Sequence, residues 1–352
     1  MLRYFLPLSL LSLLPLQAIE VWTAPGSTTL KQPFSVDFDA KGQLYGVEFQ
    51  PTNQVFTVSD GKFHYISGVK WNSEPKGAKP PAPANPRDLN PAVYNALHDI
   101  TVAPDHSLIL SDTFQHRLCR LDPQTHQTTL LAGTGIPGFK GDGGPATEAQ
   151  FNNPFCAALA PDKQSIYIAD LGNARIRRVH LPTGTIETVA GNGKRGIPTP
   201  NSVATQAPLS GPRACCVAPD GTLYIILREG HALAAVKDGK INIVVNQSGQ
   251  KGSAGDQGPA LQAQLNGPKY VCMAPSGLVL ILDTENHAVR AYDPKNHTLR
   301  TVAGTLGKPG TQVGTDWSST QLRRPHGARV GPDGKLYVVD SENDRILIGP
   351  AP

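Results

Sequence analysis

The chain has 352 residues, including 35 glycines and 32 prolines, and its formal net charge is only +4. So small a charge does not favour nucleic-acid binding, and this glycine and proline content is typical of a protein with many tight turns. The five cysteines show no CxxC or Cys/His spacing of a metal site, so we expect buried structural thiols, with no metal and no cofactor.

The first 18 residues, MLRYFLPLSLLSLLPLQA, have the pattern of a secretory signal peptide. Arg3 precedes an apolar stretch from Leu6 to Leu16, and the small residue Ala18 ends the segment. A membrane anchor is the alternative, but the stretch is short for a bilayer crossing and contains two prolines. We therefore expect an exported protein, secreted or periplasmic, without membrane insertion.

The rest of the chain contains six copies of one unit. The clearest copy begins with PFCAALAPD at residue 154, continues through SIYIADLGNARIRRVHLPTG and ends with TIETVAG at residue 191. An acidic residue or its replacement closes the second strand of each copy, at Glu48, Asp112, Asp170, Arg228, Asp283 and Asp340. A period of this size indicates a repeat architecture in which each unit packs against its neighbours.

Each unit reads as four short antiparallel strands joined by tight turns, which is the pattern of a β-propeller blade. A β-sandwich with evenly spaced strands would not explain why whole units recur. We therefore predict an all-β fold, a six-bladed β-propeller that forms one domain over residues 19–352. The expected blades cover residues 33–68, 97–133, 154–191, 212–246, 268–304 and 325–349 plus 19–26.

The two ends of the chain are predicted to close the ring together. The sixth unit stops after its third strand, DRILIGP, whereas the segment IEVWTAPG at 19–26 matches the fourth strand IETVAG of the third unit. We expect this N-terminal strand to complete the last blade, because closure removes sheet edges that would otherwise invite aggregation.

One segment departs from the repeat. Residues 74–91, EPKGAKPPAPANPRDLNP, are too rich in proline for a central strand and are predicted to form an irregular surface loop. A lid over the mouth of the propeller is the alternative role.

Several segments resemble the NHL-repeat family. They are TGIPGFKGDGGPATEAQFNNP at 134–154, DLGNARIRRV at 170–179, DQGPALQAQLNGP at 256–268 and DTENHAVR at 283–290. The resemblance covers nearly all of the chain after the signal peptide and implies a propeller, but it does not imply one activity, since function resides in sites grafted onto a fold. Its relatives include protein-binding, RNA-binding and enzymatic propellers.

The residues that recur in the copies are interpreted as scaffold. The GDGG segment lacks the GK[ST] step of a phosphate loop and the ligand spacing of a calcium loop. We expect Asp142 and Asp256 to cap the short helical turns that follow them. The paired Asp and Asn of the repeated D-x-x-N turns, at 170/173, 283/286 and 340/343, are expected to bond turn backbone.

Polar residues that differ between copies are the candidate site. The first positions of the innermost strands should form a ring at one mouth of the central channel, where convergent polar groups favour binding. A wet channel lined by unrelated side chains is the alternative. The candidate binding residues are Phe34, His98, Asp99, Phe155, Arg213, Lys269, Tyr270 and His326.

We predict a binding or scaffold module that holds a protein, a glycan or a small anionic ligand at this mouth. Arg213 and Lys269 would supply positive charge, and Phe34 and Phe155 apolar contact. The alternative is a hydrolase or lyase that resembles the gluconolactonase or peptide-amidating lyase propellers, with His98 and Asp99 as acid–base groups and no metal. We assign no catalytic residue, and we expect a monomer that binds no nucleic acid.

Overall fold

The computed structural model describes residues 18–22, 30–59, 61–69 and 89–352. The predicted signal peptide, apart from Ala18, lies outside the described residues. So does the proline-rich segment, apart from its last three residues. None of the helices in these ranges is long and apolar enough to cross a membrane.

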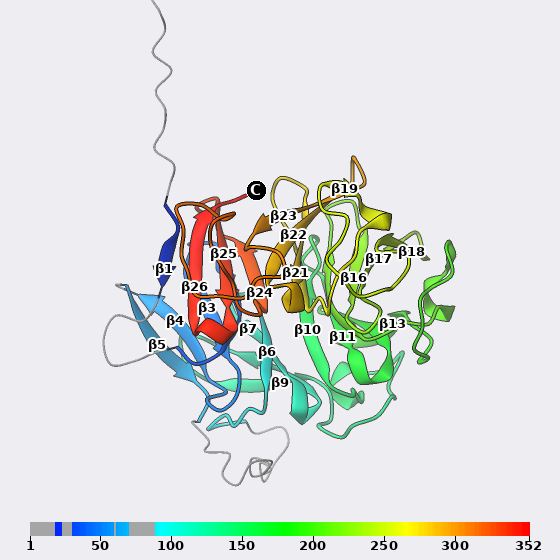
Figure 1. Cartoon of the computed structure of the whole chain (residues 1–352). Helices are drawn as coiled ribbons and strands as arrows, with labels where there is room; N and C mark the ends of the chain where they lie inside the picture. The colour runs from blue at the N-terminus through cyan, green and yellow to red at the C-terminus, as the bar shows by residue number, and fades with distance from the viewer. Residues whose placement is uncertain (1–17, 23–29, 60, 70–88) are drawn as a thin grey trace, which may run out of the picture.

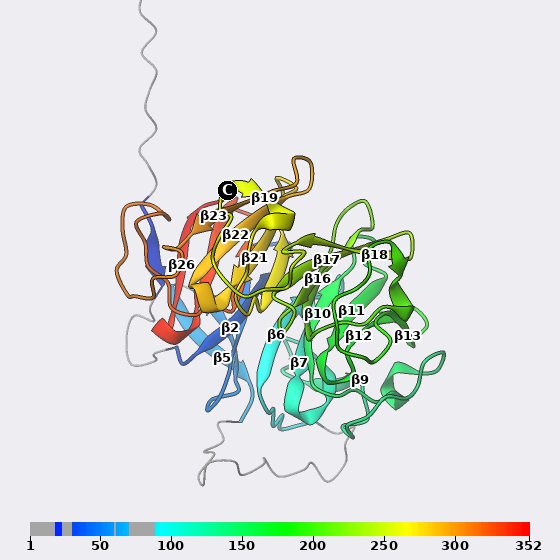
Figure 2. The same ribbon diagram turned by 45° about the vertical axis from the view of Figure 1, so that its right-hand side comes forward.

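Six antiparallel sheets are arranged as blades around a central axis (Figures 1 and 2). In the first five blades four strands follow one another from the axis outward in chain order, and the fourth and fifth blades add a short outermost strand that precedes them in sequence. The last blade takes its outer strand from the N-terminus. The prediction of a six-bladed propeller is therefore confirmed.

The first three blades each have four strands. The first contains β2 (Pro33–Phe38), β3 (Leu44–Glu48), β4 (Val55–Ser59) and β5 (Lys62–Ser67). The second contains β6 (Leu97–Val102), β7 (Leu108–Asp112), β8 (Arg117–Leu121) and β9 (Thr128–Ala132). The third contains β10 (Pro154–Leu159), β11 (Ser165–Asp170), β12 (Arg175–His180) and β13 (Thr185–Ala190).

The fourth and fifth blades each gain a two-residue outer strand. The fourth contains β15 (Pro212–Val217), β16 (Leu223–Leu227), β17 (Ala232–Lys237), β18 (Lys240–Val245) and β14 (Ser202–Val203). The fifth contains β20 (Tyr270–Met273), β21 (Val279–Asp283), β22 (Ala288–Asp293), β23 (Thr298–Ala303) and β19 (Gly258–Pro259). The sixth contains β24 (Gly327–Val330), β25 (Lys335–Asp340), β26 (Arg345–Pro350) and β1 (Glu20–Trp22).

Short 3₁₀ turns punctuate the blades. Four follow the second strand of a blade: η1 (Thr113–Gln115), η3 (Leu171–Asn173), η6 (Thr284–Asn286) and η7 (Ser341–Asn343). The other three lie in the connections between blades, each before an innermost strand: η2 (Ala146–Glu148), η4 (Ala204–Gln206) and η5 (Ala260–Gln262).

The ring closes as the sequence predicts. Strand β1 pairs with β26 in antiparallel register, with Glu20 opposite Ile348 and Trp22 opposite Ile346, and Figure 1 shows the two strands side by side. The ring of Trp22 meets Tyr337 edge-on at 6.0 Å between centroids. The chain ends thereby remove the open edge of the last blade.

The hydrophobic core lies between neighbouring blades. Side chains of β2 and β3, among them Val47, pack with Leu97 and Leu108 of the second blade, whereas Val36 packs with Val339 of the sixth. All five cysteines are buried and none forms a disulfide, in agreement with structural thiols.

The loop before each innermost strand is held from its own blade by the acid that closes the second strand. This loop-anchoring carboxylate accepts the backbone N–H of a residue that lies a few positions before the first residue of the innermost strand, at 2.6–2.8 Å. The acceptor and donor pairs are Glu48 with Lys31, Asp112 with Asn95, Asp170 with Asn152, Asp283 with Asn266, and Asp340 with Arg323. The interpretation of the repeated Asp and Asn as scaffold is confirmed, because the amides of Asn173, Asn286 and Asn343 also bond these carboxylates.

The same loop is also held by the preceding blade. A residue with left-handed backbone after the second strand accepts the next N–H of the loop in the following blade, and we call it the inter-blade acceptor. The acceptor and donor pairs are Asn53 with Ala96, His116 with Asn153, His231 with Gly267, His287 with Arg324, and Asp344 with Gln32, at 2.7–3.2 Å. The last pair joins the sixth blade to the first.

The expected capping role of Asp142 and Asp256 is wrong. Neither η2 nor η5 has a side-chain cap, because Pro145 and Pro259 occupy the N-cap positions. Asp142 lies too far upstream and instead accepts hydrogen bonds from Arg177 at 2.6 Å and from the Thr188 hydroxyl at 2.7 Å. It ties the glycine-rich loop to the third and fourth strands of its own blade.

Candidate functional site

The beginnings of the innermost strands bring most of the predicted ring together. One cavity of about 10 Å³ at this mouth of the channel is lined by seven of the eight predicted residues, with Cys156 in addition. They are Phe34, His98, Phe155, Arg213, Lys269, Tyr270 and His326. So small a space holds a single water at most, so the mouth is filled by its own side chains.

Stacked rings form this filling. Phe34 lies between Phe49 at 4.5 Å and His326 at 4.1 Å, both nearly parallel to it. His98 meets Phe34 at 5.2 Å and Phe155 at 4.3 Å, in edge-to-face arrangements. These contacts make an aromatic plug across the channel.

His98 is fixed and uncharged. Its Nδ1 lies 2.9 Å from both the carbonyl oxygen of Ala96 and the hydroxyl of Thr113. Burial, with the positive charges of Arg213 and Lys269, holds the pKa of His98 well below its usual value. The imidazole is therefore neutral near pH 7.

Asp99 is the predicted residue that the structure places elsewhere. Its carboxylate accepts hydrogen bonds from the Ser35 hydroxyl at 2.7 Å and the Ala157 N–H at 3.0 Å. It lines a second cavity, at the other end of the channel. Asp99 follows His98 directly on β6, but its two hydrogen bonds run to the innermost strands of the neighbouring blades, β2 and β10. His98 and Asp99 share no hydrogen bond, so the geometry does not support the acid–base alternative.

Two predicted cations lie beside the plug. The guanidinium of Arg213 stacks over Phe155 at 4.1 Å, and burial together with nearby Arg228 lowers its pKa to about 9. The ammonium of Lys269 lies 2.9 Å from Glu285 and 3.3 Å from Nε2 of His326, and burial lowers its pKa to about 8.

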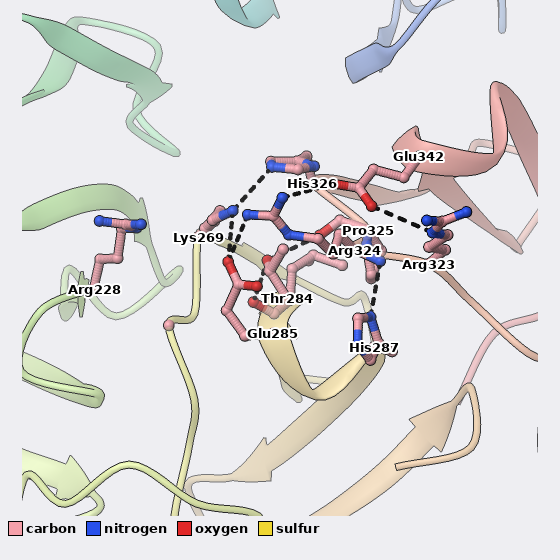
Figure 3. Close-up of polar contacts among 12 residues, drawn as sticks. Arg228, Lys269, Thr284, Glu285, His287, Arg323, Arg324, Pro325, His326 and Glu342 are labelled. Carbon is pink, nitrogen blue, oxygen red and sulfur yellow. Dashed lines mark hydrogen bonds and ion pairs between the residues drawn. The ribbon is translucent and has the colours of Figure 1, made fainter. Parts of the chain in front are cut away.

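A network of ion pairs surrounds Lys269 (Figure 3). Arg324 bridges Glu285 at 2.8 Å and Glu342 at 2.6 Å. Burial acts to raise the pKa of Glu285, but hydrogen bonds from Arg324 and Lys269 outweigh it and lower the pKa to about 2. Sequence reasoning missed Glu285, Glu342 and Arg324, although both glutamates occupy the same middle position of the repeated 3₁₀ turns.

The mouth has more cations than carboxylates. Arg228 pairs with its neighbour Glu229 at 2.7 Å, and Arg323 approaches Glu342 at 3.4 Å. Among the described residues Arg213 forms no ion pair. The cations are Arg213, Arg228, Lys269, Arg323 and Arg324, and the carboxylates are Glu229, Glu285 and Glu342.

The described residues do not form a metal-binding site. Among them, no group of three or more His, Cys, Asp or Glu residues is placed to hold an ion. The positive charges beside His98 and His326 also oppose a cation at the mouth.

The NHL-repeat resemblance is confirmed by comparison with known proteins. The family model described as NHL repeat matches residues 322–348. The chain is 27% identical to SUPPRESSOR OF QUENCHING 1, chloroplastic, of Arabidopsis thaliana, over 72% of this chain and 24% of that protein. It is 25% identical to NHL repeat-containing protein 2 of Bos taurus, over 72% of this chain and 39% of that protein. The chain thus spans well under half the length of these relatives.

Solved structures share the propeller. An auxiliary nutrient binding protein from Bacteroides ovatus superposes with a TM-score of 0.66 at 15% identity, covering 95% of this chain and 77% of that one. A gluconolactonase from Xanthomonas campestris gives 0.59 at 12% identity, covering 94% and 88%. At these identities the likeness establishes the fold alone.

Proposed function

We propose that this protein is an exported binding module whose channel mouth holds a small anionic ligand through a carboxylate or phosphate group. The observation that carries the proposal is the excess of cations at the mouth, above all Arg213, which stacks on Phe155 without an ion pair among the described residues. The predicted signal peptide at residues 1–18 supports export, as does the nutrient-binding description of the Bacteroides ovatus neighbour.

The lowered pKa values of Arg213 and Lys269 support an anion as the ligand. Both cations are desolvated, and Arg213 also lies close to Arg228 and Arg324. An anion placed among them would remove this repulsion and favour the charged form of each group. Charge-assisted hydrogen bonds to carboxylate or phosphate are among the stronger polar contacts in proteins.

The plug determines where the ligand lies. Because the rings of Phe34, His98 and His326 fill the channel, the ligand rests on the mouth rather than entering it. Its charged group would meet Arg213, the buried Lys269 would act on it through its positive charge, and an apolar part would contact the rim of the plug. Neutral His98 serves here as packing, with no proton transfer.

Calorimetric titration with phosphate, succinate and citrate tests this proposal. Arg213→Gln should weaken binding of the tightest of the three about tenfold, the amount expected for one charge-assisted contact. Arg300→Gln is the matched control, since Arg300 is exposed on the outer strand β23. Equal affinities in wild type and Arg213→Gln, or no binding of any of the three anions, would overturn the proposal.

A further inference from the structure

The opposite end of the channel has the room that the mouth lacks. A cavity of about 220 Å³ opens between the ends of the innermost strands, and all six blades contribute to its walls. Ligand pockets for drug-sized molecules are roughly 300–1,000 Å³, so this cavity suits a smaller molecule.

The cavity has two walls of different chemistry. Blades three to five provide an apolar wall that includes Ala158, Leu159, Val217 and Met273, all partly exposed to it. The first, second and sixth blades provide a polar wall of Asp37, Asp99, Thr101 and Arg329, and the phenol of Tyr270 lies between the two.

An ion pair dominates the polar wall. Nε of Arg329 lies 3.2 Å from Oδ1 of Asp37, and the two side chains remain 23% and 19% exposed. The other carboxylate oxygen of Asp37 accepts the Val102 N–H at 2.9 Å. Within the described chain, the terminal amino groups of Arg329 and the hydroxyl of Tyr270 make no hydrogen bond and are left to serve a ligand.

The charges select against a ligand with a single charge. A simple anion would meet Arg329 but also Asp37 and, behind it, Asp99, whereas a simple cation would meet the guanidinium. A molecule carrying both charges on neighbouring atoms satisfies the pair. Its carboxylate accepts from Arg329 and Tyr270, and its ammonium donates to Asp37.

We propose that this cavity binds a free α-amino acid with a small apolar side chain. The zwitterionic part lies against Arg329 and Asp37, and the side chain lies against the wall of Ala158, Leu159 and Met273. The cavity shares Cys156 and Tyr270 with the lining of the mouth, but the amino acid requires no anion at the mouth, so either proposal can fail without the other.

Calorimetry on the full-length protein tests the class of ligand with four probes. These are L-leucine, L-alanine, 4-methylpentanoate, which lacks the ammonium, and 3-methylbutylamine, which lacks the carboxylate. Loss of either charged contact should weaken binding at least about fivefold relative to L-leucine. The proposal is overturned if neither amino acid binds, or if either analogue binds within fivefold of L-leucine.

Two variants locate the binding. Arg329→Gln should abolish detectable L-leucine binding, and Ala158→Leu should do the same by filling the cavity while leaving the ion pair in place. Arg300→Gln, on the exposed face of the outer strand β23, is the control and should bind L-leucine as wild type does. Should Arg329→Gln fail to fold, Ala158→Leu decides, and a folded Ala158→Leu protein that binds L-leucine with wild-type affinity rules the cavity out.

Discussion

The boundary between the third and fourth blades differs from the other five boundaries. At each of those five, the loop before the innermost strand is held by a loop-anchoring carboxylate and by an inter-blade acceptor. Before β15 both are missing, because Arg228 stands at the carboxylate position and Ala174 at the acceptor position. The donor residue there is Gly211 with φ +65°, a backbone conformation that glycine adopts without strain.

The same boundary supplies part of the charge of the mouth. Arg213, Arg228 and Glu229 all come from the fourth blade, and the Glu229 carboxylate lies so close to Gly211 that a Cβ there would be 1.1 Å from its oxygen. The position of Arg228, whose side chain holds no loop, can therefore serve the proposed anion site.

Removing a loop-anchoring carboxylate should have the largest effect. Asp112→Asn leaves the buried guanidinium of Arg117, which now pairs with Asp112 at 2.9 Å, without a countercharge. We expect a loss of about 3–5 kcal/mol in the free energy of unfolding, measured by urea denaturation. Arg228→Gln in the fourth blade should cost less than about 1 kcal/mol. Equal losses in both variants would show that the fourth blade does not differ from the others at this position.

Removing an inter-blade acceptor should come next. Asn53 is buried, and its side chain accepts the Ala96 N–H at 2.7 Å. Asn53→Ala should destabilise the protein by about 1–3 kcal/mol, because a buried N–H loses its partner. Asn53→Asp keeps the acceptor oxygen but buries an unpaired charge, so it should not recover that loss. A wild-type unfolding midpoint for Asn53→Ala would show that the bond is not needed.

The pH dependence of anion affinity should reveal Lys269. Its pKa of about 8 lies below the usual value, so the group loses its positive charge as the pH rises through 8, and an anion gains less from it. We expect the affinity of the tightest anion to fall about tenfold between pH 7 and pH 9. Lys269→Met should bind more weakly at pH 7 and show a flatter profile. A pH-independent affinity in wild type would remove Lys269 from the site.

Restoring the missing acceptor should have the smallest effect. Ala174 has φ +48°, which asparagine tolerates better than alanine. The amide oxygen of an asparagine there could accept the N–H of Gly211, which now donates to the carbonyl of Leu209 at 3.1 Å. Ala174→Asn should raise the free energy of unfolding by about 0.5–1 kcal/mol. Ala174→Ser has no preference for this backbone and serves as the comparison. A destabilised Ala174→Asn protein would mean that the Glu229 carboxylate beside Gly211 leaves no room for the asparagine side chain.

The sequence predicts the blades, their closure and seven residues of the mouth, because these depend on a repeated pattern in which each position has a known place. It does not reveal that the mouth is closed. The fit of Phe34 between Phe49 and His326 depends on how neighbouring blades approach. It also misplaces Asp99, because the aligned Tyr270 lines the mouth whereas Asp99 bonds Ser35 and Ala157 on the neighbouring innermost strands. The partners of Lys269, Glu285 and His326, belong to the fifth and sixth blades and are brought together only by the fold.

The pairing of β1 with β26 has a consequence for synthesis on the ribosome. Glu20 is among the first described residues to be made, and its partner Ile348 among the last. Five blades can form in the order of translation, each on the one before it, but the sixth waits for the full chain. Until β26 has been made, β1 has no strand to pair with. The nascent protein must therefore keep its N-terminal strand unpaired and accessible for nearly the whole time of its production.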